Sequence, residues 1–273
     1  MQVTPVLNRL MQHTFSSFGI DFEPMNLAID IGNTHVKTAL FKGNVMTKPL
    51  VHDSFSFETL KNIVEQNKGI ENVILCTVKD YPTEWKKHLS AHFNFIELDS
   101  TTTVPIKNNY SSPKTLGKDR LATAIAVKYI HPKKNVLAIT AGTCITYDFV
   151  DNKGIYRGGA ISPGLDMRFK ALHTFTGRLP LIEADTKFTA LVGKTTEQSI
   201  LSGVQQGMLK EIEGIIASYK KKYTNLQIVV SGGSLPWLQK SLACKINTQP
   251  FLVLKGLNVI LASYFSGQNI KTR

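Results

Sequence analysis

Two short glycine turns hold the residues best suited to bind the phosphates of a nucleotide. One turn covers residues 32–34, with the sequence Gly-Asn-Thr, and the other begins at Gly142. Glycine allows the backbone to come close to a crowded anion, and the hydroxyls of Thr34, Thr143 and Thr146 would add donors without bulk. One such turn alone is more often a simple hairpin, which is why the second turn matters.

A carboxylate accompanies the first of these turns. Asp30 belongs to the apolar run LAIDI at residues 27–31, a pattern typical of a β-strand that leads into the turn. Mg²⁺ keeps most of its water shell and is commonly bound by one or two carboxylates together with phosphate groups. Asp30 is therefore predicted to hold Mg²⁺ through a water molecule.

A second set of charges begins a predicted helix at residues 118–130. Lys118, Asp119 and Arg120 fall in its first turn, ahead of an apolar face that would pack into the core. The positive end of the helix dipole favours a carboxylate there and keeps it ionised. Taken alone, Asp119 and Arg120 would more often be helix-end charges with a surface partner, so their setting decides their role.

Two familiar nucleotide-binding motifs are absent from the sequence. Residues 193–195 read Gly-Lys-Thr, like the end of a P-loop, but the glycine that a P-loop requires five positions earlier is Phe188. The sequence also has no GxGxxG segment. Use of ATP would therefore require a different fold.

Predicted strands and helices are mixed in both halves of the chain. Strands are predicted at residues 27–31, 36–41, 73–76, 136–139, 145–150 and 227–230, and helices at 83–92, 118–130, 195–222 and 255–266. In each half a strand, a glycine turn and a second strand follow one another, which predicts a duplicated α/β fold. The length of 273 residues suits two domains.

Composition argues against several classes of protein. Hydrophobic residues make up 42% of the chain, and no stretch approaches the roughly 18 apolar residues of a membrane span. The net charge of +12 comes with dispersed lysines and no interleaved aromatic residues, which disfavours nucleic-acid binding. Three widely separated cysteines indicate a reducing compartment rather than disulfides or a zinc site.

Residues 1–24 are predicted to be a disordered extension or to precede the true start.

The order of these motifs resembles that of the type III pantothenate kinases, members of the acetate kinase, sugar kinase, Hsp70 and actin superfamily. The resemblance covers about residues 25–265. The matching motifs are DIGNTHVKTALF at 30–41, Tyr110 followed by GKDR at 117–120, AGTCITYDFV at 141–150, GGAISPGL at 158–165, TGRLPLIE at 176–183, GKTTEQSILSGV at 193–204 and SGG at 231–233. Any one could arise by chance, whereas seven in register are very specific.

The resemblance implies phosphoryl transfer from ATP to pantothenate, the first step of coenzyme A biosynthesis. It implies that Asp119 is the catalytic base and that Arg120 pairs with the substrate carboxylate, for which a planar guanidinium offers two parallel hydrogen bonds. Pantothenate would contact Tyr110, Gly117, Lys118, Arg120 and Thr196. The ATP-binding residues would be Asp30, Ile31, Gly32, Asn33, Thr34, His35, Val36, Lys37 and Thr143. Thr196 is also explained by a helix cap, and both roles are compatible.

The resemblance also predicts the architecture and the partners. Two actin-like ATPase domains of the ribonuclease H-like type, at residues 25–131 and 132–273, would close a cleft around ATP, Mg²⁺ and pantothenate. A monovalent cation, K⁺ or NH₄⁺, is expected as a further cofactor. The enzyme is expected in the cytoplasm as a homodimer, with the pantothenate pocket near the subunit interface and the apolar helix at 195–222 as a contact surface.

One position departs from the family pattern. The family usually has an aspartate just before the second AGT element, where it is linked to the monovalent cation, and this chain has Thr140. A hydroxyl can bind K⁺, but the loss of a negative charge should weaken the site. The departure keeps open an alternative, a catalytically weakened relative with a regulatory or scaffolding role. A sugar or acetate kinase is disfavoured, because GKDR with Tyr110 upstream resembles the pantothenate enzymes specifically.

Overall fold

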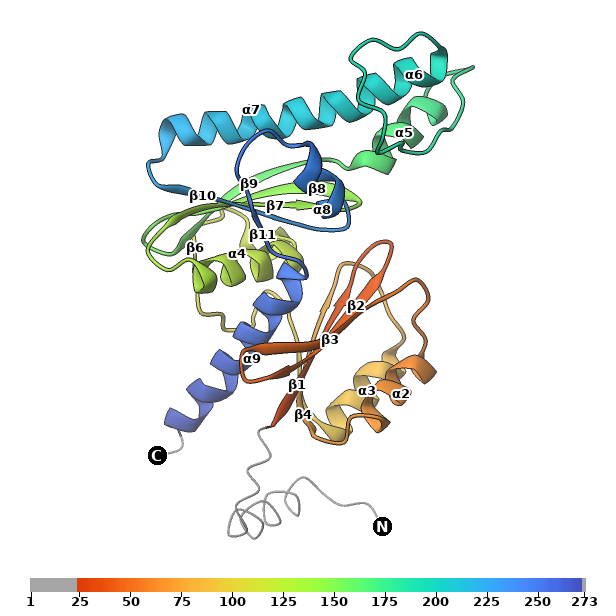
Figure 1. Ribbon diagram of the computed structural model, residues 1–273. Helices are drawn as coiled ribbons and strands as arrows, with labels where there is room; N and C mark the ends of the chain where they lie inside the picture. Colours follow the sequence, from red (N-terminus) through yellow and green to blue (C-terminus); the bar gives the residue numbers. More distant parts are fainter. Residues whose placement is uncertain (1–23, 272–273) are drawn as a thin grey trace. The chain divides into compact units, whose positions relative to one another are not determined.

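The computed structural model describes the backbone of residues 24–271 and the side chains of residues 24–266 (Figure 1). The predicted N-terminal extension therefore lies outside the described residues, apart from Pro24. Packing divides the chain into two compact units. The first contains the described residues up to Pro105, Gly117–Asp119 and the chain from Val253 onward, and the second contains Ile106–Leu116 and Arg120–Leu252. The domain boundary predicted between residues 131 and 132 stays a prediction.

A five-stranded mixed sheet forms the centre of the first unit. Its strands are β1 (Met25–Ile31), β2 (Val36–Lys42), β3 (Val45–His52), β4 (Ile70–Thr77) and β5 (Asn94–Glu97), in the order β3-β2-β1-β4-β5. β1, β2 and β3 pair antiparallel, whereas β4 and β5 extend the sheet in parallel. The near-continuous apolar runs of β1 and β4 suit their central place, because strands covered on both faces need few polar side chains.

Helices cover both faces of this first sheet. α2 (Phe57–Glu65) and α3 (Thr83–His92) cover one face, and the core there contains Leu27, Ile29, Ile31, Leu60, Val73, Leu75, Trp85 and Leu89. α9 (Leu252–Lys271) contacts the other face, where the Asn26 side-chain amide donates a hydrogen bond to Asn258 at 2.8 Å. Because side chains alternate along a strand, Asp30 points to the same face as Asn26.

A six-stranded sheet forms the centre of the second unit. Its strands are β6 (Lys107–Asn108), β7 (Asn135–Ala141), β8 (Cys144–Val150), β9 (Ile155–Pro163), β10 (Leu226–Ser231) and β11 (Asn247–Thr248), in the order β11-β10-β7-β8-β9-β6. β7, β8 and β9 pair antiparallel, and β10 and β11 run parallel to β7. Both units therefore contain a three-stranded antiparallel meander that is extended by two parallel strands, as the predicted duplication requires.

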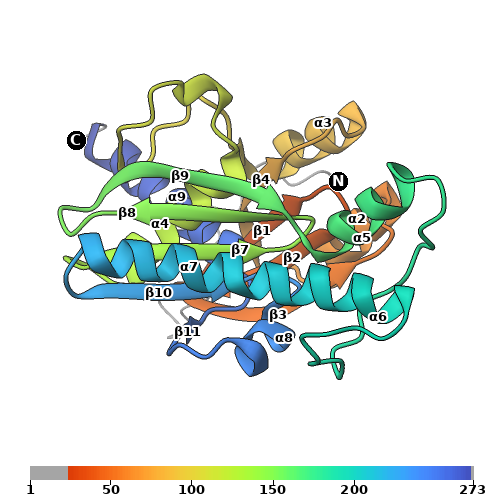
Figure 2. The same ribbon diagram turned by 90° about the horizontal axis from the view of Figure 1, so that it is seen from above.

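The helices of the second unit lie on opposite faces of its sheet. Their bounds are α4 (Lys118–Ile130), α5 (Leu165–Thr174), α6 (Thr196–Leu201), α7 (Gly207–Lys222) and α8 (Leu235–Ser241), with a 3₁₀ turn at Pro113–Thr115. α7 lies along one face and α4 lies on the other (Figures 1 and 2). On the α7 face, Tyr147 joins a core with Ile200, Met208 and Ile212.

Most of the predicted elements are confirmed. All six predicted strands are present, and the helices at 83–92 and 118–130 have the predicted bounds. The helix predicted at 195–222 is interrupted by a π-helical segment at Ser202–Gln206, which separates α6 from α7. Strands β3, β5, β6, β9 and β11 and helices α2 and α8 were not predicted. In the described part of the chain, every helix is too short or too polar to cross a membrane.

Candidate active site

The first glycine turn is closed by its own backbone. The Gly32 amide donates a hydrogen bond to the His35 carbonyl at 3.1 Å, and the Lys79 ammonium donates to the Asn33 carbonyl at 3.4 Å. Asn33, Thr34 and His35 are exposed at the tip. The Gly32 amide is thus engaged within the turn, and other groups of the tip would have to contact a phosphate.

Asp30 lies two residues before this turn, and its side chain is only 4% exposed. It pairs in register with Lys37 on β2 and Cys76 on β4. Burial raises the pKa of Asp30 to about 6; Lys37, whose Nζ lies 4.0 Å from Oδ2, opposes the rise, and the negative charge of Asp119 adds to it. The first unit therefore brings Asp30 and Asp119 into one electrostatic neighbourhood.

The Asp30 carboxyl fits a hydrated Mg²⁺ ion. A divalent cation would stabilise the ionised form of a buried carboxyl whose pKa is raised. Among the described residues, no group of three or more His, Cys, Asp or Glu side chains could hold a metal ion. The remaining ligands would have to be water and nucleotide phosphate, which is how proteins usually bind Mg²⁺.

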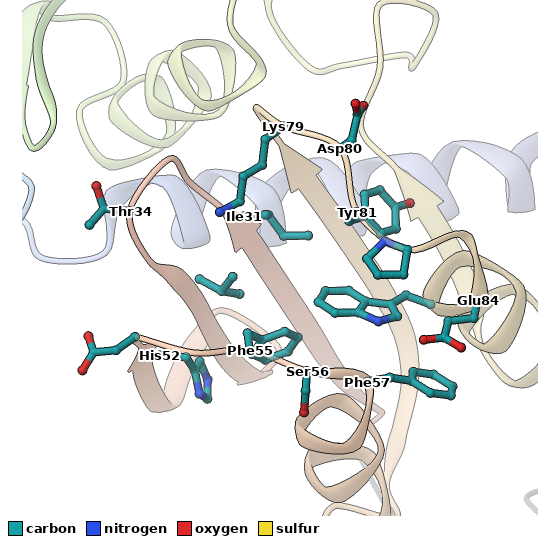
Figure 3. A pocket seen from close by; sticks show the side chains of 14 residues that line it. Ile31, Thr34, His52, Phe55, Ser56, Phe57, Lys79, Asp80, Tyr81 and Glu84 are labelled. Carbon is teal, nitrogen blue, oxygen red and sulfur yellow. The ribbon is translucent and has the colours of Figure 1, made fainter.

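A cavity of about 420 Å³ lies on the α2 and α3 face of the same sheet (Figure 3). Ile31 and Thr34 line it, together with the aromatic side chains of Phe55, Tyr81 and Trp85. The Trp85 indole nitrogen is buried and has no hydrogen-bond partner in the described part of the chain. The two carboxylates are not among the lining residues, so this cavity is distinct from the carboxylate pair.

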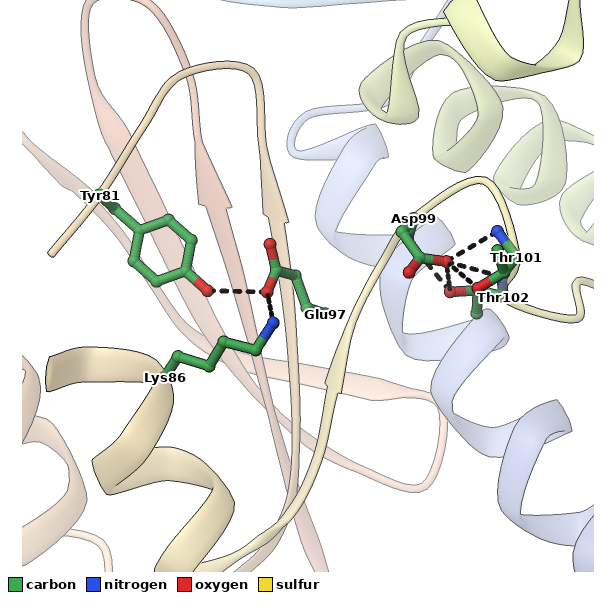
Figure 4. Close-up of polar contacts among 6 residues, drawn as sticks. All are labelled: Tyr81, Lys86, Glu97, Asp99, Thr101 and Thr102. Atoms are coloured by element: carbon green, nitrogen blue, oxygen red, sulfur yellow. Dashed lines mark hydrogen bonds and ion pairs between the residues drawn. The ribbon is translucent and has the colours of Figure 1, made fainter. Parts of the chain in front are cut away.

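Tyr81 lines this cavity, and its hydroxyl contacts the ion pair between Lys86 and Glu97 (Figure 4). Its hydroxyl donates to Glu97 at 3.0 Å, and Lys86 Nζ lies 2.7 Å from the same carboxylate oxygen. Burial and this hydrogen bond raise the pKa of Tyr81. Asp99 accepts hydrogen bonds from the hydroxyls and amides two and three residues further on, which lowers its pKa. These bonds fix the segments before and after β5.

In the second unit, three glycine motifs converge on the second turn. The Gly164 amide donates to the Thr143 carbonyl at 3.0 Å, and a Cβ at Gly164 would lie 2.1 Å from the Gly142 carbonyl oxygen. Gly232 has a φ of +99°, and a Cβ there would lie 2.2 Å from the Ala141 carbonyl oxygen. Only glycine permits both approaches. The AGT, GGAISPG and SGG motifs therefore meet, with Thr143 exposed at their junction.

Arg120 is buried against a carboxylate of the second sheet. Its Nε donates to Asp148 Oδ1 at 2.9 Å, and the Tyr156 hydroxyl donates to the same oxygen at 2.8 Å. The Tyr110 ring centroid lies 5.8 Å from the guanidinium carbon of Arg120. Arg120 is therefore not a helix-end charge with a surface partner. Asp148 Oδ1 also lies 2.8 Å from Nη2, so the carboxylate holds the Nε–Nη2 edge of the guanidinium.

Thr140 belongs to a polar strip on the same face of the second sheet. It pairs in register with Thr146 on β8 and Ser231 on β10, so the three side chains point to the face of Asp148. The Thr140 hydroxyl is buried without a hydrogen-bond partner among the described residues. Hydroxyl oxygens suit a monovalent cation, but the strip has no carboxylate at Thr140 to balance its charge.

Thr196 is exposed at the start of α6, and Thr195 caps this helix by accepting a backbone hydrogen bond at 3.2 Å. α6 packs on the face of the sheet that carries Tyr147, whereas Asp148, the next residue, points to the face of Arg120. Thr196 and Arg120 therefore lie on opposite faces of the second sheet, and one chain does not bring them together.

The remaining predicted residues belong to the first unit. Ile31 and Val36 are largely buried in the core of the first unit, and both also line the cavity on the α2 and α3 face. Gly117 and Lys118 are half-buried and directly precede Asp119 at the start of α4.

Sequence reasoning missed two buried or half-buried polar clusters. One consists of Asp148 and Tyr156 around Arg120, and the other contains an ion pair between Arg168 and Glu211. Asp148 follows Thr146 by two residues within the AGTCITYDFV motif, and strand alternation places both on one face. That signal could have found Asp148, whereas the other partners are too far apart in sequence to leave a local pattern.

Comparison with known proteins places these motifs in one family. The family model described as type III pantothenate kinase matches residues 26–218. A type III pantothenate kinase of Christiangramia forsetii is 42% identical over 238 residues, which are 87% of this chain and 98% of that protein. One of Bacteroides fragilis is 43% identical over 249 residues, 89% of this chain and 100% of that protein.

A solved structure supports the fold. The activator of the 2-hydroxyisocaproyl-CoA dehydratase from Clostridium difficile, with bound ADPNP, matches with a TM-score of 0.50 and 12% identity, covering 91% of this chain and 97% of its own. At this identity the likeness concerns the fold alone. Together with the two mixed sheets, it confirms the predicted α/β fold of duplicated actin-like ATPase domains.

Proposed function

The chain belongs to the type III pantothenate kinase family, and from that premise we propose how its residues carry out the ATP-dependent phosphorylation of pantothenate in coenzyme A biosynthesis. The observation that carries the proposal is the match of residues 26–218 to the family model, which covers both Asp30 and Asp119, and the negative charge of Asp119 acts on the buried carboxyl of Asp30. In phosphoryl transfer, a proton acceptor has to stand near the groups that hold the nucleotide phosphates. A pair of neighbouring carboxylates supplies one residue for each task.

The nucleotide side of the reaction is assigned to residues 30–37 and Thr143. Asp30 would hold Mg²⁺ through water, and the exposed tip at residues 33–35 and Thr143 would contact the phosphates. The bound Mg²⁺–ATP would supply positive charge that neutralises the phosphate oxygens as the bond to the leaving group breaks. Lys37 stands near enough to Asp30 to moderate its charge in the absence of the cation.

The acceptor side is assigned to Asp119 and to the residues around Arg120. Asp119 would take the proton from the pantothenate hydroxyl late in the transfer, since the transition state is loose. Arg120 would bind the substrate carboxylate, with Tyr110 packed against its guanidinium. Gly117 and Lys118 would line the same approach.

A monovalent cation is proposed for the polar strip at Thr140. The buried hydroxyl without a hydrogen-bond partner in the described chain supports a missing ligand there. Because the strip lacks the aspartate that the family usually has at this position, we expect weak binding of K⁺ or NH₄⁺.

We further propose that the enzyme is a homodimer. The stripe of α7 that was expected at the interface is buried in the core of its own unit, at Met208 and Ile212. Exposed apolar side chains lie instead between α5 and α6, where Phe175 is 85% and Leu191 is 77% exposed. A second copy covering this segment would also bring its Thr196 toward an acceptor pocket that one chain leaves incomplete.

The reaction is assigned to the cytoplasm. The wide separation of the three cysteines Cys76, Cys144 and Cys244 in the sequence supports a reducing compartment. Pantothenate and ATP are small anions, and a chain with a net charge of +12 attracts them. The positive charge therefore does not require nucleic acid as a partner.

The proposal is tested by release of ADP from purified protein with ATP and Mg²⁺, with and without pantothenate, and with and without KCl. We expect ADP only when pantothenate is present, together with a phosphorylated acceptor. ADP release that does not depend on pantothenate would instead indicate a simple ATPase. Nucleotide binding without turnover would indicate a relative that has lost catalysis.

A further inference from the structure

We propose that Asp148 and Tyr156 are positioning residues that hold the Arg120 guanidinium in the orientation that receives the substrate carboxylate. The inference rests on the proposed role of Arg120 in binding pantothenate. Neither residue needs to touch the substrate, because both act through Arg120 and through Tyr110 beside it.

A single carboxylate oxygen fixes the guanidinium. Asp148 Oδ1 accepts a hydrogen bond from Arg120 Nε at 2.9 Å and lies 2.8 Å from Nη2 as an ion pair. Nη2 nevertheless has no hydrogen-bond partner among the described residues. Asp148 is fully buried and Arg120 is 6% exposed. The guanidinium is therefore anchored by one edge, and a buried N–H group is left for another acceptor.

Tyr156 locks this arrangement from a neighbouring strand. Its hydroxyl donates to Asp148 Oδ1 at 2.8 Å, and its ring stacks on Tyr110 with centroids 6.2 Å apart and planes at 26°. Tyr110 in turn packs against the Arg120 guanidinium. Four side chains thus form a closed ring of contacts, so a shift of any one of them disturbs the orientation of Arg120.

The charge balance supports a role in orientation rather than in attraction. Burial raises the pKa of Asp148, and the Arg120 guanidinium and the Tyr156 hydroxyl oppose this rise by stabilising the carboxylate. A carboxylate beside Arg120 weakens its long-range pull on an anionic substrate. Asp148 therefore improves binding only if the direction of the remaining N–H groups matters more than the net charge.

The test compares two acceptors, pantothenate and its neutral analogue in which a primary alcohol replaces the carboxylate. For Tyr156→Phe, which keeps the ring and removes one donor to Asp148, we expect KM for pantothenate to rise roughly 5-fold. For Asp148→Asn we expect a rise of roughly 10-fold or more. In both variants kcat, KM for ATP and the KM or inhibition constant of the neutral analogue should stay within about 2-fold of the parent values.

Tyr223→Phe is the matched control, since its ring packs on Phe149 at 4.2 Å, away from Arg120. Equal losses for both acceptors in Tyr156→Phe, or a lower KM for pantothenate in Asp148→Asn, would overturn the inference. If Asp148→Asn fails to fold, Tyr156→Phe decides alone.

Arg120→Ala separates this inference from the proposed function. If Arg120→Ala weakens pantothenate but not the neutral analogue, while Tyr156→Phe and Asp148→Asn show no such difference, only the positioning roles are wrong. If Arg120→Ala raises KM equally for both acceptors, Arg120 does not bind the carboxylate. The substrate-binding role that the proposed function gives to Arg120 is then wrong.

Discussion

Asp119 and Arg120 are adjacent on one helix, yet their surroundings are opposite in kind. Asp119 interacts with another carboxyl, Asp30, whose pKa burial raises to about 6. Arg120 is matched by the buried carboxylate of Asp148 and by the hydroxyl of Tyr156. The acidic side thus carries two carboxylates that Lys37 balances only in part, which suits binding of a cation with a nucleotide. The basic side is balanced and fixed, which suits recognition of a substrate by direction.

The largest expected effect comes from removing the charge of Asp119. Asp119→Asn should lower kcat by a factor on the order of 10²–10⁴, the usual contribution of a general base, and leave nucleotide affinity nearly unchanged. ADP release and nucleotide titration measure the two quantities. Asp166→Asn is the matched control, because Asp166 is an exposed aspartate in the first turn of α5. An active Asp119→Asn enzyme would remove Asp119 from the base role.

The free energy of unfolding of the metal-free protein should depend on pH because the Asp30 carboxyl is buried. Folding raises the pKa of Asp30 from 3.8 to about 6, so its carboxyl favours the fold when protonated, and this contribution is lost as pH rises through 6. Asp30→Asn should therefore be more stable than the parent at pH 7.5, by up to roughly 3 kcal/mol, with no gain at pH 4. Thermal unfolding across this pH range measures the difference. A gain that does not depend on pH would contradict the burial of an ionised Asp30.

Thr140→Asp adds a second carboxylate to the face of the sheet that carries Asp148 and Arg120. It therefore tests whether this side, like the Asp30 side, binds a cation once its charge is unbalanced. The new carboxylate would be buried on the face of Asp148 and would need a cation. We expect KCl to raise the melting temperature of Thr140→Asp by a few degrees relative to N-methylglucamine chloride, and to stimulate its turnover at lower concentration than in the parent. Identical responses of variant and parent to potassium would show that position 140 does not bind the ion.

A smaller effect is expected from the amide chain that supports the acidic side. The side chain of Asn94 donates to Asn72, Asn72 to Asn26 and Asn26 to Asn258, at 2.8–2.9 Å, which ties α9 to the first sheet. Asn258→Leu would leave the buried Asn26 amide unpaired and should lower the free energy of unfolding by about 1–3 kcal/mol in urea titrations. Asn152→Ala, at an exposed position, provides the control. Equal stability of the two variants would mean that the row of asparagine hydrogen bonds does not stabilise the fold.

Local patterns carried much of the fold. The apolar run around Asp30 predicts a buried strand, and the apolar spacing at residues 118–130 predicts a helix, because both patterns depend on neighbours in sequence. The helix predicted at 195–222 has the right apolar stripe, but a π-helical segment interrupts it at Ser202–Gln206. The backbone hydrogen bonds in this segment depend on packing against α5. The local sequence carries no information about that packing.

The candidate site was predictable only in its motifs. The residues of the Asp30 turn and of the GKDR motif stand out by type, whereas the buried partner of Arg120 does not. Asp148 and Tyr156 meet Arg120 only because β8 and β9 pair beside α4, and contacts between distant segments leave no local signal. The same reason hid the separation of Thr196 and Arg120 on opposite faces of one sheet.

The interaction of Asp30 with Asp119 is tested most directly by ¹³C NMR titration of the Asp30 carboxyl in metal-free protein, with Asp30→Asn to identify its resonance. The parent protein should titrate near pH 6, and Asp119→Asn should titrate at lower pH, because one neighbouring negative charge is gone. An Asp30 pKa that is the same in both proteins would contradict the shared site on which the proposed mechanism depends.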